Sequence, residues 1–132
     1  MTAIYLDSSA LVKLVVTEPE SSALVEFLRS RSDRVSSAVA LAEVPRALRR
    51  GGFGASERRR SREVMARIAL VDVDRRILAA AAALDPPGLR TLDAIHLATA
   101  LAVREDLAAL VTYDRRLAAA AERAHLDVSA PS

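Results

Sequence analysis

Residues 2–16 read TAIYLDSSALVKLVV, in which Asp7 separates a short apolar run from a longer apolar stretch. The run over residues 2–6 contains isoleucine, tyrosine and leucine and predicts a buried strand. Aspartate is a favoured N-cap residue, so a helix is predicted over residues 8–16. Parallel α/β sheets are built from strands that lead into helices, and this stretch therefore indicates an α/β fold.

The same alternation of apolar runs and helical patterns continues along the chain. It predicts a central, mostly parallel sheet with helices on both faces, which is a three-layer α/β/α sandwich. No linker or change of composition divides the sequence, so residues 1–132 are expected to form a single domain. Further strands are predicted near Val35–Ser36 and over residues 68–73, 108–113 and 126–128, and further helices over residues 20–32, 39–50 (bent or restarted at Pro45), 56–68, 74–84, 91–105 and 114–124.

Composition restricts the kinds of site that the chain can contain. The 132 residues include no cysteine and two histidines, which excludes disulfides and thiolate metal sites. Carboxylates are plentiful, and oxygen ligands of this kind favour Mg²⁺ or Mn²⁺. The apolar stretches are too short to cross a bilayer, and no signal peptide is visible. A cytoplasmic location without membrane contact is therefore expected.

Four acidic residues stand where an α/β fold could bring their side chains together. Asp7 and Asp114 each follow a predicted strand, and parallel sheets bind ligands at the carboxyl ends of their central strands. Glu43 lies in the apolar stretch VALAEV, and Asp93 lies at the start of a predicted helix. Taken singly, the aspartates suit helix starts and Glu43 could face solvent. Taken together, the four predict a shared acidic site.

Four carboxylates that converge would repel one another. Two like charges about 4 Å apart repel by roughly 4 kcal/mol at an effective dielectric constant near 20. Either some of the carboxylates are protonated, or a divalent ion offsets the repulsion. Such an ion would also neutralise phosphate oxygens and acidify water for attack on phosphorus. The pattern therefore favours metal-dependent chemistry on a phosphodiester.

Four segments, spread in order over nearly the whole chain, match one known family: YLDSSALVKLVVTEPES (5–21), SSAVALAEVPRALRR (36–50), LRTLDAIHLATAL (89–101) and LVTYDRRLAAAAERA (110–124). With these segments the chain resembles a PIN-domain ribonuclease and, more narrowly, the VapC-type toxins of bacterial toxin–antitoxin pairs. Each segment alone would be a weak signal, but their order and spacing make the resemblance specific. The family's acidic residues fall on Asp7, Glu43, Asp93 and Asp114.

The resemblance implies a toxin that is a Mg²⁺-dependent endoribonuclease, with Mn²⁺ as a substitute, and that cleaves RNA by metal-activated water. It also implies a homodimer and a cognate antitoxin that blocks the acidic site. Hydroxyl residues of the family fall on Ser8, Ser9 and Thr112, and the last two are expected to support the acids. The family commonly has glycine where this chain has His125, which puts the local turn in doubt because a helix end often needs positive φ.

The basic residues are all arginine except Lys13. Arginine favours bidentate contacts with phosphate. Lys13, Arg46, Arg49 and Arg50 are therefore candidates for contact with RNA or with the antitoxin. A solvated helix face is the alternative interpretation of the arginines between Arg46 and Arg62, and the sequence leaves both open.

Three further residues are not expected to act in the reaction. His96 lies one helical turn after Asp93 and is interpreted as a hydrogen-bonded, partly buried histidine rather than a general base. Asp72 and Asp74 belong to a strand that the PIN-like fold puts toward an edge of the sheet, and they are excluded from the site.

Two other functions are compatible with parts of this pattern. A catalytically inactive PIN-like module would keep the fold and bind RNA or a protein partner. An aspartyl phosphatase would also have an acid after the first strand, but such enzymes resemble Asp-x-Asp there, and the sequence from Asp7 to Ser9 lacks the second acid.

Overall fold

One parallel sheet forms the centre of the molecule. Its strands are β1 (Ala3–Leu6), β2 (Arg34–Ser37), β3 (Ala69–Val71), β4 (Leu107–Val111) and β5 (Val128–Ser129). In this computed structural model, which describes residues 2–132, their order is β3-β2-β1-β4-β5 and each neighbouring pair is parallel. The predicted α/β class is confirmed, while Met1 of the expected domain lies outside the described residues.

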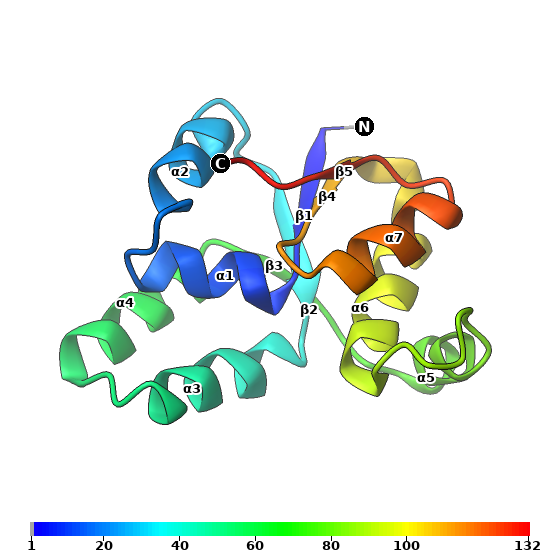
Figure 1. Cartoon of the computed structure of the whole chain (residues 1–132), viewed down its shortest axis with the longest axis horizontal. Helices are drawn as coiled ribbons and strands as arrows, with labels where there is room; N and C mark the ends of the chain where they lie inside the picture. The colour runs from blue at the N-terminus through cyan, green and yellow to red at the C-terminus, as the bar shows by residue number, and fades with distance from the viewer. Residues whose placement is uncertain (1) are drawn as a thin grey trace.

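Helices cover both faces of the sheet in three layers (Figure 1). One face carries α1 (Ser8–Val15), α2 (Ser21–Leu28), α3 (Ala40–Arg50) and α4 (Ala55–Met65), and the other carries α5 (Arg75–Ala82), α6 (Thr91–Ala102) and α7 (Arg115–Arg123). Within residues 2–132, no helix has the length and apolar character needed to span a membrane.

The central strand β1 contributes to both hydrophobic cores. Ile4 and Leu6 are buried with the helices α1–α3, whereas Tyr5 is buried on the other face with α6 and α7. Successive side chains of a strand point to opposite faces, so a strand covered on both sides is continuously apolar. The apolar run ends at Asp7, where the chain leaves the sheet and begins α1.

Of the predicted bend or restart of the helix at Pro45, the restart is wrong, because α3 runs through Pro45 without interruption. Proline has no N–H and deprives the carbonyl four residues earlier of its helical partner. Val44 and Leu48, on either side of Pro45, are almost fully buried. Their packing against α1 and the sheet favours continuation of the helix over a break.

Several elements are shorter than the apolar patterns predicted. The helix α2 ends at Leu28 instead of residue 32, and the segment that follows it is exposed, so no packing supports a longer helix. The strand β3 has three residues rather than the six of 68–73. The helix α6 ends at Ala102 and is followed by a separate 3₁₀ turn, Arg104–Asp106.

The helix α7 ends in the turn that the sequence put in doubt. His125 has a φ of 65°, a conformation that glycine adopts at little cost. Its N–H donates to the Glu122 carbonyl and the Leu126 N–H donates to the Ala121 carbonyl, each at 3.0 Å. These two bonds form a Schellman motif, so the turn is retained although histidine is strained in it.

Candidate active site

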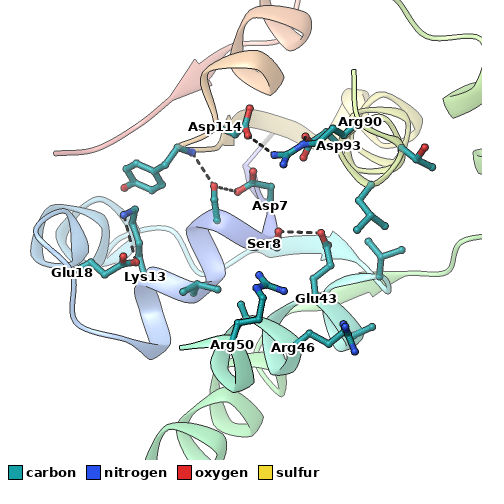
Figure 2. A pocket seen from close by; sticks show the side chains of 18 residues that line it. Asp7, Ser8, Lys13, Glu18, Glu43, Arg46, Arg50, Arg90, Asp93 and Asp114 are labelled. Atoms are coloured by element: carbon teal, nitrogen blue, oxygen red, sulfur yellow. Dashed lines mark hydrogen bonds and ion pairs between the residues drawn. The ribbon is translucent and has the colours of Figure 1, made fainter. Parts of the chain in front are cut away.

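A cavity of about 730 Å³ opens at the carboxyl ends of β1 and β4 (Figure 2). From β1 the sheet extends through β2 and β3 to one side and through β4 and β5 to the other. Such topological switch points are where α/β sheets bind ligands. The structure brings all four acids predicted from the sequence to the wall of this cavity: Asp7, Glu43, Asp93 and Asp114.

Asp7 is the most deeply buried of these acids, with 2% of its surface exposed. It caps α1, and its Oδ1 accepts from the Ala10 N–H at 3.0 Å and from Ser9 Oγ at 2.6 Å, while Thr112 Oγ1 donates to Oδ2. Burial raises the pKa of the Asp7 carboxyl above its ordinary value, and the three hydrogen bonds oppose that rise. Asp7 would therefore gain from a cation placed in the cavity.

Ser9 and Thr112 connect Asp7 to the loop after β4. The Ser9 hydroxyl oxygen accepts from the Tyr113 N–H at 3.0 Å, and the Thr112 hydroxyl oxygen accepts from the Asp114 N–H at 3.1 Å. Each hydroxyl therefore donates to the Asp7 carboxylate and accepts from the neighbouring backbone. This arrangement fixes the ends of β1 and β4 relative to each other, so that Asp7 and Asp114 line the same cavity.

Glu43 projects from α3 and is held at both carboxylate oxygens. Ser8 Oγ donates to Oε2 at 3.2 Å, and His96 Nε2 lies 2.6 Å from Oε1. His96 is completely buried rather than partly buried as predicted. Its Nδ1 lies 2.7 Å from the Tyr5 hydroxyl, and burial raises the pKa of that phenol far above its ordinary value.

Arg90 spans the other two acids. Its Nε lies 3.2 Å from Asp93 Oδ2 and its Nη2 lies 3.0 Å from Asp114 Oδ2. Burial and the charge of Asp114 raise the pKa of Asp93, and the guanidinium opposes that rise. The sequence pattern did not point to Arg90. Its position three residues before Asp93 was a usable signal for that ion pair, whereas nothing local indicates Asp114.

The donor chemistry fits a divalent cation of the Mg²⁺ class. The four acids present carboxylate oxygens, which hard cations prefer, and an Arg90 cation already compensates Asp93 and Asp114. Within the described chain, however, no three Asp, Glu or His side chains are grouped closely enough to hold one ion. The acids share a cavity, but in this conformation they do not share a single coordination sphere.

The comparisons with known proteins identify the family. Residues 4–123 match the family model of the PIN domain. Over 132 residues the chain is 54% identical to "Ribonuclease VapC46" of Mycobacterium tuberculosis, and the match covers 100% of both chains. This chain belongs to the VapC ribonucleases of the PIN-domain family. The prediction from the sequence that the chain is a VapC-type ribonuclease toxin is thereby confirmed.

Two further relatives agree with this assignment. The chain is 44% identical over 135 aligned positions to "Ribonuclease VapC35" of Mycobacterium tuberculosis, which covers 97% of this chain and 96% of the relative. The fold is similar to that of VapBC2 from Rickettsia felis, solved bound to a DNA fragment from their promoter, with a TM-score of 0.72 and 17% identity. That alignment covers 98% of this chain and 99% of the other. The predicted PIN-like architecture is thereby confirmed.

Basic side chains at the rim of the acidic cavity of this VapC ribonuclease could attract a polyanion. Arg46 and Arg50 of α3 line the cavity, whereas Arg49 does not (Figure 2). Lys13 also lines it, but its Nζ lies 2.8 Å from Glu20 and 3.5 Å from Glu18. Arg46 and Arg50 form no ion pair within residues 2–132. They are the better placed of the basic residues named from the sequence.

The acids that were excluded lie away from the VapC cavity. Asp72 and Asp74 follow the edge strand β3, are exposed, and do not line the cavity. Asp74 caps α5 by accepting a hydrogen bond from the Ile77 N–H at 2.9 Å. It has the same local role as Asp114 at α7 but stands at a different place in the sheet.

Proposed function

We propose that this chain is a Mg²⁺-dependent endoribonuclease, with Mn²⁺ as a substitute, and the toxin of a toxin–antitoxin pair. The observation that carries the proposal is the convergence of Asp7, Glu43, Asp93 and Asp114, from four separate elements, on one cavity at the switch point of the sheet. These four residues would hold the ion. A buried aspartate and a pair of aspartates bridged by a cationic side chain are the features expected of a site built for added positive charge.

When bound, Mg²⁺ supplies the positive charge that lets an RNA phosphate approach the acids, and it lowers the pKa of the attacking water. The chain's own residues prepare the site. Ser9 and Thr112 fix the Asp7 carboxylate by hydrogen bonds. Arg90 is 70% exposed at its side chain, so its guanidinium can withdraw from Asp93 and Asp114 into water at little cost.

The proposed reaction is hydrolysis of an internal phosphodiester. The oxygen of water bonds to phosphorus, the bond from phosphorus to the 3′-oxygen breaks, and that oxygen leaves with a proton. The products therefore carry a 5′-phosphate and a 3′-hydroxyl. Attack by the ribose 2′-hydroxyl would instead give a cyclic phosphate, so analysis of the ends identifies the nucleophile.

Arg46 and Arg50 are proposed to contact RNA phosphates beside the acids. Their position on α3 at the cavity wall supports this role, and arginine binds phosphate through a planar fork of donors. A cognate antitoxin that covers the same cavity, a homodimeric state and a cytoplasmic location complete the proposal, on the strength of family membership.

The test compares the unaltered chain with Asp93→Asn, purified in parallel, on total bacterial RNA. We expect cleavage in Mg²⁺ and in Mn²⁺, with none in excess EDTA and none by Asp93→Asn in any buffer. Asp72→Asn is the matched control, since Asp72 is exposed and outside the cavity, and it should cleave normally.

Equal cleavage by Asp93→Asn, or in EDTA, would refute the metal-dependent mechanism. RNA that is bound but left intact by the unaltered chain with Mg²⁺ would favour the inactive PIN-like module. Cyclic phosphate ends would refute attack by water.

A further inference from the structure

Glu43 is the only one of the four acids whose carboxylate contacts a completely buried side chain of another helix. His96 of α6 has no exposed surface, and its Nε2 lies 2.6 Å from Glu43 Oε1. The contact joins α3 to α6, two helices on opposite faces of the sheet. The contact therefore fixes the position of one helix relative to the other.

The hydrogen bonds around His96 specify where its proton resides. The Tyr5 hydroxyl lies 2.7 Å from Nδ1. The Glu43 carboxylate on the other side of the ring can only accept a hydrogen bond. Since Nε2 lies 2.6 Å from Glu43 Oε1, Nε2 is the nitrogen that donates and carries a proton.

The Nε2 proton points at Glu43 Oε1, and Ser8 Oγ donates to the other oxygen. The Glu43 carboxylate therefore accepts a hydrogen bond at each of its oxygens. An imidazole in the Nε2–H tautomer accepts at Nδ1, where the Tyr5 hydroxyl lies 2.7 Å away.

We propose that His96, which contacts Tyr5 at Nδ1 and donates through Nε2–H, is a positioning residue that fixes the Glu43 carboxylate toward the acidic cavity. A glutamate side chain has several rotatable bonds, and holding it in one orientation beforehand removes that ordering cost from ligand binding. Hydrogen-bond partners behind metal-binding carboxylates serve the same purpose in other metalloproteins. The inference rests on the proposed function in one respect only, namely that Glu43 is one of the residues that would bind the divalent ion.

The first test is spectroscopic and needs neither metal nor RNA. Heteronuclear NMR distinguishes a protonated from an unprotonated imidazole nitrogen, and the chain has two histidines, of which His125 is exposed. His125→Gly leaves His96 as the single imidazole. We expect a proton on Nε2. An Nε2 without a proton would overturn the inference.

The second test separates positioning from simple core packing. In His96→Gln the amide nitrogen can take the place of Nε2 and donate to Glu43, whereas the shorter side chain in His96→Asn cannot reach that place. Mn²⁺ affinity of the purified chain without RNA is the readout. We expect His96→Asn to lose about 10- to 100-fold in affinity and His96→Gln to stay close to the unaltered chain. Equal loss in both variants would indicate a packing role only.

Glu43→Gln separates this inference from the proposed function. If Glu43→Gln leaves Mn²⁺ affinity unchanged, Glu43 does not hold the ion and that part of the proposed function fails. If Glu43→Gln weakens binding and His96→Asn does not, the His96 inference alone fails. Should His96→Asn not fold, Tyr5→Phe removes the donor to Nδ1 with less change of volume, and it should mix the two tautomers in the NMR spectrum.

Discussion

Arg90 and Asp114 are 24 positions apart in the sequence, yet Arg90 Nη2 lies 3.0 Å from Asp114 Oδ2 at the mouth of the acidic cavity. The same guanidinium reaches Asp93 through Nε. The exposed Arg90 guanidinium therefore neutralises two of the four acids. It occupies the position in which a divalent ion is expected to bind. An ion that binds there has to compete with Arg90.

Replacing Arg90 with glutamine should tighten Mn²⁺ binding by a small factor. An exposed ion pair is weak, so removal of the competing guanidinium lowers the dissociation constant only a few-fold. Titration of the purified chain with Mn²⁺, without RNA, measures the change. Arg49→Gln removes a charge outside the cavity and should change nothing. Weaker binding by Arg90→Gln would show that Arg90 helps to build the site rather than compete for it.

The double variant Arg46→Ala with Arg50→Ala should lower kcat/KM for RNA cleavage mainly through KM. Each phosphate contact with single-stranded nucleic acid adds about 0.7 to the steepness with which log affinity decreases with log salt concentration. With two contacts removed, the negative slope of log kcat/KM against log salt concentration should become shallower by about 1.4. Cleavage rates measured over a range of salt concentrations give this slope. Arg49→Ala should keep the original slope, and an unchanged slope in the double variant would exclude phosphate contacts by these two residues.

Thr112→Val should destabilise the metal-free chain by about 2 kcal/mol, measured by urea unfolding. The substitution removes a hydroxyl that donates to the buried Asp7 carboxylate and accepts from the Asp114 N–H, and hydrogen bonds to charged groups contribute about 1.5–3 kcal/mol. Thr99→Val is the control, because Thr99 is also buried and donates only to the neutral carbonyl of Ile95. It should cost about half as much. Equal losses would mean that the Asp7 contact contributes nothing beyond an ordinary hydrogen bond.

His125→Gly should stabilise the fold by about 1 kcal/mol. A side chain at a φ of 65° is strained, and glycine in a left-handed helix cap avoids that strain. Thermal or urea unfolding measures the gain. His125→Ala removes the imidazole but retains Cβ, so it should leave stability nearly unchanged. A gain in the alanine variant as large as that in the glycine variant would assign the effect to the imidazole instead.

Tyr113 should ionise near pH 12 in the folded chain. Burial, then the charges of Glu20 and Asp7, raise the pKa of this phenol from 10.0 to about 12. Because the folded-state pKa is raised, the fold favours the neutral phenol. Its contribution to stability is complete below pH 10 and is lost as pH rises from about 10 to 12. Spectrophotometric titration detects this step, and the Tyr113→Phe variant should lack it. A phenol that ionises near pH 10 before unfolding would contradict the expectation.

Local sequence patterns were sufficient for the class of fold and for four of the five acids that line the cavity, Glu18 being the one not predicted. The strand before Asp7, Ala3–Leu6, contains no charged residue and is mostly apolar, and a strand buried on both faces requires that pattern. The helix starts at Asp7 and Asp114 were readable because capping depends on neighbouring residues. Element ends were less well predicted. The apolar pattern of residues 68–73 extends past the three residues that pair as β3, and the pairing partner β2 lies far away in the sequence.

The sequence by itself determined the class of fold and the four acids predicted for the site. Strand and helix periodicity and the four ordered family segments are local patterns, so they can be recognised without the structure. Only the tertiary structure decided that Arg90 reaches Asp114 as well as Asp93, that His96 connects Tyr5 with Glu43, and that Arg50 lines the cavity while Arg49 does not. The physical reason is that these contacts join separate elements, and their distances depend on the order of the strands and on the packing of α3 and α6, which no stretch of neighbouring residues encodes.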